Sequence, residues 1–483
     1  MNEKFRSVIS HSSDDKIKVA YSWYGPKGPI WNTELPNILM YSAMAEGVNP
    51  NMESRHFWCD DLWTKLFSKH KDLYEIVPLQ YIEHDDLRPC VFPYSLTWRI
   101  PFQTYFNGSG GILEFSHMPG WFIHMLKFFN CYILLDHAVE AYMSDQELES
   151  MYSYFHHKHN IPMYKIMYMT GSINGEEIYN KWADKNNIPN DIDHRMKIIS
   201  YASSRDIFST YLNSGTNEGK LPVEPEYDVN YVPEKLFLTW NRRYRRHRIY
   251  LGLLLEQLNL IDRTFISFPK YQEENSLETF DSRVAELDRP LALWGYHGVT
   301  FSQDDVQKFS RRLPLVIDGE TDINKMCEDF NATLDFYQRS LVSLITETNY
   351  DASETTLTEK SFKPLLNKHP FIILGRPGVL KGLRDMGFKT FDKLWDESYD
   401  QIQDPGVRLA KIAETIKDIA SWSPEKILEF KANVKPILEH NYQTLKEFGS
   451  VIVGKQIYNH ITDHFETGLH YVTCEQVKCW QHG

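Results

Sequence analysis

Short apolar runs recur along the first half of the chain, separated by segments long enough for a helix. The runs expected to form strands are residues 17–22, 74–79, 131–136, 165–170 and 197–201. A loop rich in glycine and proline, residues 23–30, follows the first run and leads to a helical pattern at residues 37–45. Because strands that alternate with helices are typical of parallel sheets, the pattern predicts an α/β fold.

A polar, turn-rich stretch at residues 213–231 is expected to be a linker to a second block with the same alternation. The apolar segments expected to be strands of that block are residues 234–239, the neighbourhoods of Phe265 and Leu341, and residues 371–374. A long helix is expected after Arg245, and residues 404–440 have amphipathic helical spacing. The tail from residue 448 starts as a helix.

The length of 483 residues is too great for one ordinary core, so more than one domain is expected. We predict an N-terminal domain at residues 1–225, a second domain at residues 233–440 and a helical tail at residues 441–483. Both domains are expected to be of the α/β class.

Composition and charge limit the possible surroundings and partners of the chain. A net charge of −13 argues against a surface that binds nucleic acid as a whole, so a DNA contact would need a local basic patch. The six cysteines are scattered, which fits a reducing cytosol. The N-terminus is polar, and no run approaches the roughly 20 apolar residues that span a bilayer. We expect a soluble, cytoplasmic protein with no membrane partner.

The segment of residues 343–391 is the most informative part of the chain for function. It places Thr358, Glu359, Lys360 and Lys363 at a helix start, just before the apolar strand 371–374. A carboxylate there can accept ribose hydroxyls, while ammonium groups and free backbone N–H groups can meet phosphates. The segment therefore favours a nucleotide-sugar site. The alternative is an exposed charge pair between Glu359 and Lys363, which are four residues apart.

Two further features of the same segment are weaker signals. Glu347 follows the strand near Leu341 and is a second candidate for donor binding, with a helix or turn cap as the alternative. The turn Gly375-Arg376-Pro377-Gly378 lies between a strand and a helix and could approach a phosphate, but an ordinary turn explains it as well.

A basic cluster follows the first strand of the second block. It contributes the candidates Asn241, Arg242, Arg243 and Arg246, and it opens a helix. Arginines at a helix N-terminus oppose the helix dipole, and a bound phosphate would remove that conflict. Strand-to-helix turns are also where α/β sheets bind ligands. The alternative is a solvated basic face.

The first half offers several candidates for a base that removes a proton from an acceptor hydroxyl. Glu34 lies in the first strand-to-helix loop, Glu114 follows a glycine loop, and Asp136 ends an apolar strand. Less favoured candidates near them are His117, His137 and Glu140.

Histidines and cysteines do not form a convincing metal site in the sequence. His156, His157 and His159 lack a second cluster of ligands, and the Cys474/Cys479 pair is similarly isolated. We therefore expect no metal and no cofactor.

Two elements of the chain resemble a known donor motif. Thr346-Glu347-Thr348-Asn349 followed by Leu357-Thr358-Glu359-Lys360 resembles the motif of α1,3-fucosyltransferase-type GT-B glycosyltransferases. The chain is more closely similar to phage and bacterial glycosyltransferase-like proteins. These share the Asn-Arg-Arg turn, here Asn241 to Arg243, and a Thr-Glu-Lys-x-Phe-Lys-Pro run, here residues 358–364. The resemblance covers residues 236–408.

The resemblance implies a GT-B fold, in which two Rossmann-like domains face a cleft and the C-terminal one holds the nucleotide sugar. It also implies that Glu359 meets the ribose. Lys360, with an arginine of the 242–246 cluster, would meet the pyrophosphate. We therefore expect a metal-independent, inverting glycosyltransferase that uses a nucleotide-sugar donor.

The acceptor stays open between a glycan, a small molecule and a hydroxymethylated pyrimidine in phage DNA. If the protein is phage-encoded, its place would be the host cytoplasm. A non-catalytic nucleotide- or carbohydrate-binding protein of the same fold is the alternative class. Release of nucleoside diphosphate from a donor would support an enzyme over the non-catalytic binding protein.

Overall fold

A computed structural model gives the fold of the chain. It describes residues 16–21, 24–25, 28–29, 72–78, 88–95, 120–138, 143–214, 221–270, 301–317, 334–447 and 451–468. The chain forms two compact units: unit 1 is Met1–Tyr201 with Ser450–Gly483, and unit 2 is Ala202–Gly449. The C-terminal end of the chain therefore belongs to the same unit as its first half.

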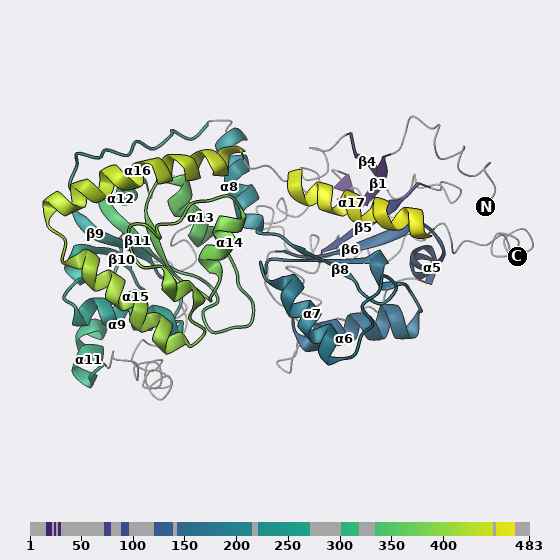
Figure 1. Ribbon diagram of the computed structural model, residues 1–483, viewed down its shortest axis with the longest axis horizontal. Helices are drawn as coiled ribbons and strands as arrows, with labels where there is room; N and C mark the ends of the chain where they lie inside the picture. Colours follow the sequence, from purple (N-terminus) through teal and green to yellow (C-terminus); the bar gives the residue numbers. More distant parts are fainter. Residues whose placement is uncertain are drawn as a thin grey trace, which may run out of the picture. The chain divides into compact units, whose positions relative to one another are not determined.

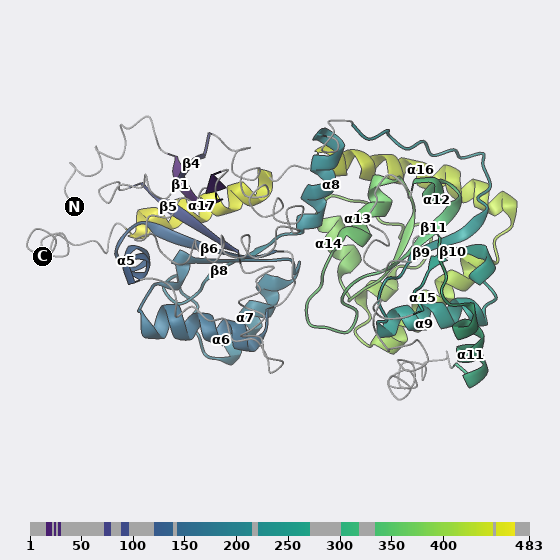
Figure 2. The same ribbon diagram turned by 180° about the vertical axis from the view of Figure 1, so that it is seen from behind.

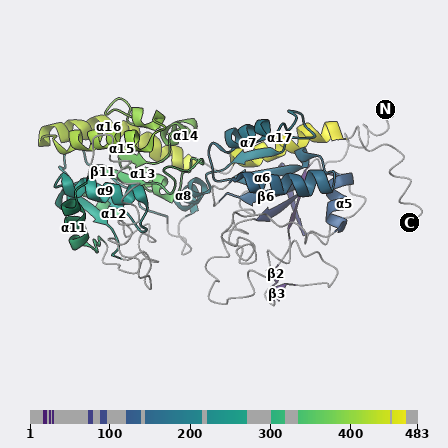
Figure 3. The ribbon, with the colours of Figure 1, turned by 90° about the horizontal axis from the view of Figure 1, so that it is seen from below.

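Unit 1 is built on a six-stranded parallel sheet in the order β4-β1-β5-β6-β7-β8 (Figure 1). Its strands are β1 (Ile17–Tyr21), β4 (Tyr74–Pro78), β5 (Cys90–Ser95), β6 (Cys131–His137), β7 (Ile166–Thr170) and β8 (Lys197–Ser200). The short strands β2 (Tyr24–Gly25) and β3 (Gly28–Pro29) pair antiparallel outside that sheet (Figure 3). Strand order reverses beside β1, as in doubly wound sheets.

Alternate side chains of the central strands of unit 1 fill two separate cores. Ile133 and Leu135 of β6 pack into one core, whereas Tyr132 and Leu134 pack into the other. This follows from the two-residue period of a strand, and it explains why β6 is apolar at consecutive positions from Cys131 to Leu135. The helices that the structure describes in the first-half segment of unit 1 are α5 (Gly120–Phe128), α6 (Asp145–Met151), η3 (Tyr152–Lys158), η4 (Met163–Lys165) and α7 (Gly175–Lys185).

The helix α17 (Val451–Gly468) completes the second core of unit 1 (Figure 1). Its Ile457 and Ile461 are fully buried there, four residues apart on one helical face. His460 on the same helix donates from Nε2 to the carbonyl of Tyr164, at 2.8 Å. The tail thus covers the sheet of the first half of the chain.

Unit 2 is built on a four-stranded parallel sheet in the order β10-β9-β11-β12. Its strands are β9 (Lys235–Trp240), β10 (Thr264–Ser267), β11 (Ser340–Thr346) and β12 (Phe371–Leu374). All seven residues of β11 are buried, because helices cover both faces of the sheet.

Helices α8, α13 and α16 pack together on one face of the unit 2 sheet, and α9 and α11 pack together on the other (Figure 1 and Figure 2). The helices of unit 2 are α8 (Ser203–Ser214), α9 (Arg246–Gln257), η5 (Ile261–Arg263), α11 (Gln303–Arg312), α12 (Leu334–Gln338), α13 (Glu359–Leu366), α14 (Val379–Asp385), η6 (Ser398–Gln401), α15 (Pro405–Ala420) and α16 (Pro424–Glu447). None of the helices in the described ranges is both long and apolar enough to cross a membrane.

The predicted α/β class with parallel sheets is confirmed in both units. Every apolar run that was expected to be a strand forms one, and where bounds were predicted the ends differ by at most one residue. The sequence pattern missed β5, where Pro93 interrupts the apolar run. The helix expected at residues 37–45 lies outside the described residues.

The boundaries of the units differ from the predicted domain boundaries for physical reasons. Helix α8 packs against α13 and α16, so it joins unit 2 although it precedes the polar stretch. The part of the expected linker at residues 221–231 is bound to unit 2 by an ion pair and a hydrogen bond. Lys368 forms an ion pair with Glu224 at 2.6 Å, and Lys431 donates to the carbonyl of Tyr231 at 2.7 Å.

Candidate functional site at the carboxyl edge of the unit 2 sheet

The candidate site lies where β9 and β11 end side by side. From β9 the chain passes through α9 to β10 on one side, and from β11 it passes through α13 to β12 on the other side. Such a reversal of strand order opens a crevice at the carboxyl ends of the strands, which is where open α/β sheets bind ligands. The loops after β9 and β11 carry the donor-site candidates.

Asn241 ties the ends of three strands together at the base of this crevice. It is 1% exposed and accepts a 3.0 Å hydrogen bond at Oδ1 from the hydroxyl of Thr346 on β11. Its backbone N–H donates to the carbonyl of Ser267 on β10, at 3.1 Å. The predicted donor-binding residue Asn241 is therefore used within the sheet, where it sets the spacing of the strand ends.

The arginines that follow form a basic entrance to helix α9. Arg245 is the N-cap of α9, and its side chain does not cap the helix. Arg242 is partly buried, whereas Arg243 is exposed and its guanidinium forms no hydrogen bond or ion pair with any residue that the structure describes. The first turn of α9 thus has an electropositive end with no carboxylate or hydroxyl cap from its own N-cap residue.

Arg248 places a second cation beneath this entrance. It is 3% exposed and makes two long hydrogen bonds of 3.4 Å, to the carbonyls of Arg243 and Thr346. Its Nε has no hydrogen-bond partner within the described part of the chain. Burial, with the charge of Arg245, lowers the pKa of Arg248 to about 10, so it stays charged at neutral pH. A buried cation with incomplete hydrogen bonding favours an anion close by.

The loop between β11 and α13 is fastened to the start of α9. Arg245 Nη1 donates to the carbonyl of Thr348 at 2.5 Å, and His247 Nε2 donates to the carbonyl of Glu347 at 2.8 Å. The His247 ring stacks on Tyr350 of the same loop, with ring centroids 5.2 Å apart. Burial, reinforced by the charge of Arg248, holds the pKa of His247 well below its usual range, so the ring is neutral. These contacts give the loop a fixed position beside the arginines.

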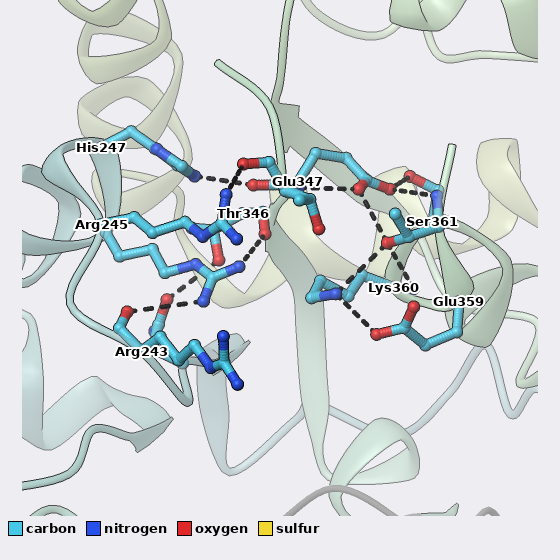
Figure 4. Close-up of polar contacts among 12 residues, drawn as sticks. Arg243, Arg245, His247, Thr346, Glu347, Glu359, Lys360 and Ser361 are labelled. Atoms are coloured by element: carbon cyan, nitrogen blue, oxygen red, sulfur yellow. Dashed lines mark hydrogen bonds and ion pairs between the residues drawn. The ribbon is translucent and has the colours of Figure 1, made fainter. Parts of the chain in front are cut away.

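Glu347 is fully buried and accepts four hydrogen bonds at its carboxylate (Figure 4). The donors and distances are the Thr348 N–H at 3.0 Å, the Thr358 N–H at 2.9 Å, the Thr358 hydroxyl at 2.8 Å and the Ser361 hydroxyl at 2.6 Å. Its side chain therefore joins the end of β11 to the start of α13, and both of its carboxylate oxygens accept hydrogen bonds from donors of the protein.

Helix α13 presents a charged pair in its first turn. The hydroxyl of Thr358, the N-cap, accepts from the Lys360 N–H at 3.4 Å. Lys360 Nζ bonds Glu359 at 2.6 Å, with the two side chains 26% and 47% exposed. Partial burial raises the pKa of Glu359, but the charge and hydrogen bond of Lys360, together with the charge of Lys363, outweigh it and lower the pKa to about 2. Lys363 itself is buried within α13.

The three helices that begin at this edge differ in how their N-termini are satisfied. Thr358 caps α13, and the carboxylate of Asp400 accepts from the N–H groups of Leu380 and Lys381 at 2.9 and 3.0 Å, so α14 is capped as well. Helix α9 has no such side-chain cap from its N-cap residue. The arginine-rich end of α9 is therefore the N-terminus best suited to an external anion.

The turn Gly375-Arg376-Pro377-Gly378 is occupied by internal contacts. Gly378 has a left-handed φ of 87°, a conformation that glycine adopts without strain. The guanidinium of Arg376 donates to the carbonyl of Ala352 and to the hydroxyl of Thr355, at 2.5 and 3.1 Å. The turn thus supports the β11–α13 loop.

Arg246, another predicted donor-binding residue, is paired with a carboxylate of the loop. Its Nη1 lies 3.1 Å from the Asp351 carboxylate, and the two side chains are 32% and 50% exposed. Asp351 thus occupies a position where an external anion could meet Arg246.

Replacing Asp351 with Asn is expected to strengthen the binding of inorganic pyrophosphate. Exposed ion pairs are worth up to about 1 kcal/mol, so release of Arg246 can tighten binding by up to about fivefold. Isothermal titration calorimetry at low salt measures the change. The matched control is Asp385→Asn, which releases Lys381 on α14 from a similar exposed pair. Weaker binding by Asp351→Asn would contradict the expectation.

Of the three residues predicted as a catalytic base, the structure describes only Asp136. Asp136 is the next-to-last residue of β6 in unit 1, is 2% exposed and accepts from the N–H of Ala138 at 2.9 Å. Next to it, Nδ1 of the buried His137 lies 2.7 Å from the hydroxyl of Tyr168. Glu34 and Glu114 lie outside the described residues, as do His117 and Glu140.

The histidines of η3 do not form a metal site with their described neighbours. His156 lies beside His194, with ring centroids 5.2 Å apart, and His194 pairs with Asp191 at 2.6 Å. Within the described ranges, no group of three or more histidine, cysteine, aspartate or glutamate residues is arranged to hold a metal ion. The Cys474/Cys479 pair lies outside these ranges.

Several residues that shape the site were not selected from the sequence. They are Arg245, His247, Arg248 and Ser361. Their proximity to the chosen residues was visible in the sequence, since Ser361 lies within the 358–364 run and the other three lie in or directly after the 242–246 cluster. Their burial and their contacts across the loops were not visible. Ser361 had one usable signal, because it is three residues after the N-cap Thr358 and so shares its end of the helix.

No protein-family model matches the chain, and no curated protein matches its sequence. Several solved structures show weak similarity to it, and three of them are named here. The N-terminal domain of a Candida albicans trehalose-6-phosphate phosphatase has a TM-score of 0.40 and 11% identity, covering 93% of this chain and 98% of that chain. A UDP-forming alpha,alpha-trehalose-phosphate synthase from Burkholderia vietnamiensis has a TM-score of 0.35 and 10% identity, covering 96% of this chain and 100% of that chain. An alpha1,3-fucosyltransferase has a TM-score of 0.24 and 13% identity, covering 88% of this chain and 91% of that chain. Similarity at this level does not assign a family, so the proposal below rests on the site.

Proposed function

We propose that this protein is a glycosyltransferase of the GT-B type and that unit 2 binds the nucleotide-sugar donor. The observation that carries the proposal is the start of α9, where an N-terminus without a side-chain cap from its N-cap residue meets the exposed Arg243 and the buried, incompletely bonded Arg248. This combination favours a diphosphate, because helix N–H groups and guanidinium groups both bind phosphate oxygens.

The neighbouring helix α13 supplies groups suited to the rest of the donor. Glu359 is half exposed and its pKa of about 2 keeps it ionised, so it can accept hydrogen bonds from ribose hydroxyls. Lys360 can exchange its bond with Glu359 for a phosphate oxygen. Its charge would then stabilise the diphosphate as it leaves.

The proposed reaction is an inverting substitution at the anomeric carbon. The oxygen of an acceptor hydroxyl forms the new bond to that carbon, while the bond from the carbon to the diphosphate oxygen breaks and the diphosphate keeps the electron pair. A base takes the hydroxyl proton, with Asp136, Glu34 and Glu114 as candidates. This scheme uses no metal. The acceptor is proposed only as a hydroxyl, on a glycan, a small molecule or a hydroxymethylated base of DNA.

A thermal-shift screen with UDP, GDP, CMP and dTDP sugars tests the donor site. A donor at one hundred times its Kd is expected to add about 2.7 kcal/mol to the stability of the protein, which raises Tm measurably. Replacing Arg243 with Gln should weaken binding about tenfold or more, because a charge-assisted bond is lost.

The matched control is Arg311→Gln, which removes an exposed arginine from α11. No shift with any donor, or equal binding by wild type and Arg243→Gln, would overturn the proposal. Donor binding without any release of nucleoside diphosphate, with or without glycan or DNA acceptors, would favour the non-catalytic alternative.

A further inference from the structure

Glu347 poses a question that the proposed function leaves open. It is fully buried, so it cannot touch a donor, yet it is a carboxylate at the centre of the site. A buried carboxylate is costly unless it is fully hydrogen-bonded, and apolar residues usually serve packing better. The four donors around Glu347 meet that requirement. Their positions indicate what the residue does.

The carboxylate of Glu347 fixes the start of α13. Oε1 accepts from the Thr358 N–H and the Ser361 hydroxyl, and Oε2 accepts from the Thr358 hydroxyl. Thr358 precedes Glu359 and Lys360, and Ser361 follows them. The pair that is proposed to meet the donor is thus held from both sides by one buried side chain, as Figure 4 shows.

The backbone of the same residue is held from the α9 side. His247, from the first turn of α9, donates to the carbonyl of Glu347, and Arg245 donates to the next carbonyl, that of Thr348. Glu347 therefore joins the start of α9 to the start of α13 by direct hydrogen bonds. In Figure 4 it lies between these two groups of side chains.

We propose that Glu347 is a positioning residue that holds the Glu359–Lys360 pair at a fixed distance from the arginines of α9. The inference rests on the proposed function, because one nucleotide sugar would have to reach both groups at once. A misplacement of about 1 Å can cost about a hundredfold in rate, so a rigid link has a direct catalytic use.

The chemistry of the four donors requires a carboxylate at this position. Two backbone N–H groups and two hydroxyl groups point at Glu347, so both of its oxygens must accept. The substitution Glu347→Gln replaces one of these oxygens with an NH₂ group, which only donates and would face a backbone N–H. It therefore keeps the size and shape of the side chain while it breaks the link on one side.

The test compares Glu347→Gln with Glu397→Gln in the full-length protein. Glu397 is a buried carboxylate of the same unit that accepts from the N–H of Phe391 at 2.7 Å and pairs with Arg384 at 3.2 Å. These partners are not residues of the candidate site. Both variants lose a buried acceptor, so both should lower Tm, while only Glu347→Gln should weaken donor binding, by about tenfold, and lower kcat.

Two outcomes would overturn the proposal. One is donor binding and kcat in Glu347→Gln that match the wild type. The other is an equal loss of both in Glu347→Gln and Glu397→Gln, which would show a purely structural role. If Glu347→Gln fails to fold, Ser361→Ala removes one donor and leaves the carboxylate in place, and it should show the same defect more weakly.

A second readout separates this inference from the proposed function. Hydrogen exchange of the amides at residues 358–361 reports whether the start of α13 is held, and it needs no ligand. Faster exchange there in Glu347→Gln than in Glu397→Gln would support the link even if the wild-type protein bound no nucleotide. Unchanged exchange would overturn it, whatever the outcome of the donor screen.

Discussion

Replacing Lys360 with Ala is expected to lower the turnover of sugar transfer by about two to three orders of magnitude, in line with the loss of one preorganised charge that stabilises a transition state. Lys360 is the partly exposed cation on α13, and its Nζ bonds two close neighbours in sequence, Glu359 at 2.6 Å and the Thr358 hydroxyl at 3.3 Å. Without it, the negative charge that develops on the departing diphosphate loses one of its stabilising cations, and the carboxylate of Glu359 beside it is left unneutralised by Lys360. Steady-state kinetics with the donor found in the screen measure the loss.

The fold should survive this change. The Lys360–Glu359 pair is partly exposed, and such pairs contribute at most about 1 kcal/mol, so Tm should move by only a few degrees. Lys381→Ala is the control, because it removes a similar exposed pair from the first turns of α14, and it should leave turnover unchanged. Full activity of Lys360→Ala would sink the assignment of this site. A large fall in Tm would show that Lys360 has a structural role instead.

The sequence predicts the sheets well because several of their strands are buried along their whole length. In β6, β7 and β11 every position is buried, and the corresponding runs are apolar with few interruptions. Strand β5 escaped notice because Pro93 breaks the run. Strand order depends on pairings between runs far apart in the sequence, so the reversal between β9 and β11 could be expected from the α/β class but not located.

The packing of α17 in unit 1 could not be predicted from the sequence. The tail has a helical pattern, but the pattern does not say which core receives its apolar face. Ile457 and Ile461 pack with Tyr132 and Leu134 of β6, more than three hundred residues earlier in the chain. A helix that follows α16 could equally have packed against unit 2. The unit it joins is decided by which core has an apolar surface that fits the apolar face of α17.

The part of the candidate site that is formed by neighbours in the sequence could be predicted. Thr358, Glu359 and Lys360 are neighbours in sequence, and the structure places them at a helix start as expected. Some of the other candidates are buried and others are exposed, and the sequence does not reveal which. Asn241 and Glu347 are both buried and bonded within the protein, although each was chosen as a ligand contact. Polar residues of one motif can therefore shape a site without facing its ligand.

Buried histidines in both units predict that the protein loses stability in mild acid. His137 and His460 in unit 1 and His369 in unit 2 each have a pKa that burial lowers to about 4, and burial holds the pKa of His247 well below its usual range. In the unfolded chain these rings titrate near pH 6.5. The unfolded state therefore binds more protons between pH 6.5 and 4, and stability must fall as the pH is lowered through this window.

The expected effect is large because several groups act in the same direction. A histidine whose pKa falls from 6.5 to about 4 costs up to about 3 kcal/mol at pH 4. Unit 1 contains two such rings, His137 and His460, and unit 2 contains His369. The lowered pKa of His247 acts in the same direction in unit 2. The contribution of these neutral histidines to stability should be complete above about pH 6.5. Glu359, whose pKa is lowered from 4.5 to about 2, loses its contribution to stability as the pH falls below about 4.5, so it adds little to the change between pH 6.5 and 4.5.

Urea unfolding from pH 7.5 to pH 4.5 measures this loss, and His460→Gln assigns part of it. The Nε2 of His460 donates to the carbonyl of Tyr164, and a glutamine amide can make the same bond without titrating. At neutral pH the variant should be close to the wild type in stability. Below pH 6.5 it should lose less stability than the wild type, and the difference should appear in the transition of unit 1. If the two proteins keep parallel pH profiles, His460 does not stay neutral in the folded state, and the explanation by buried histidines fails for that unit.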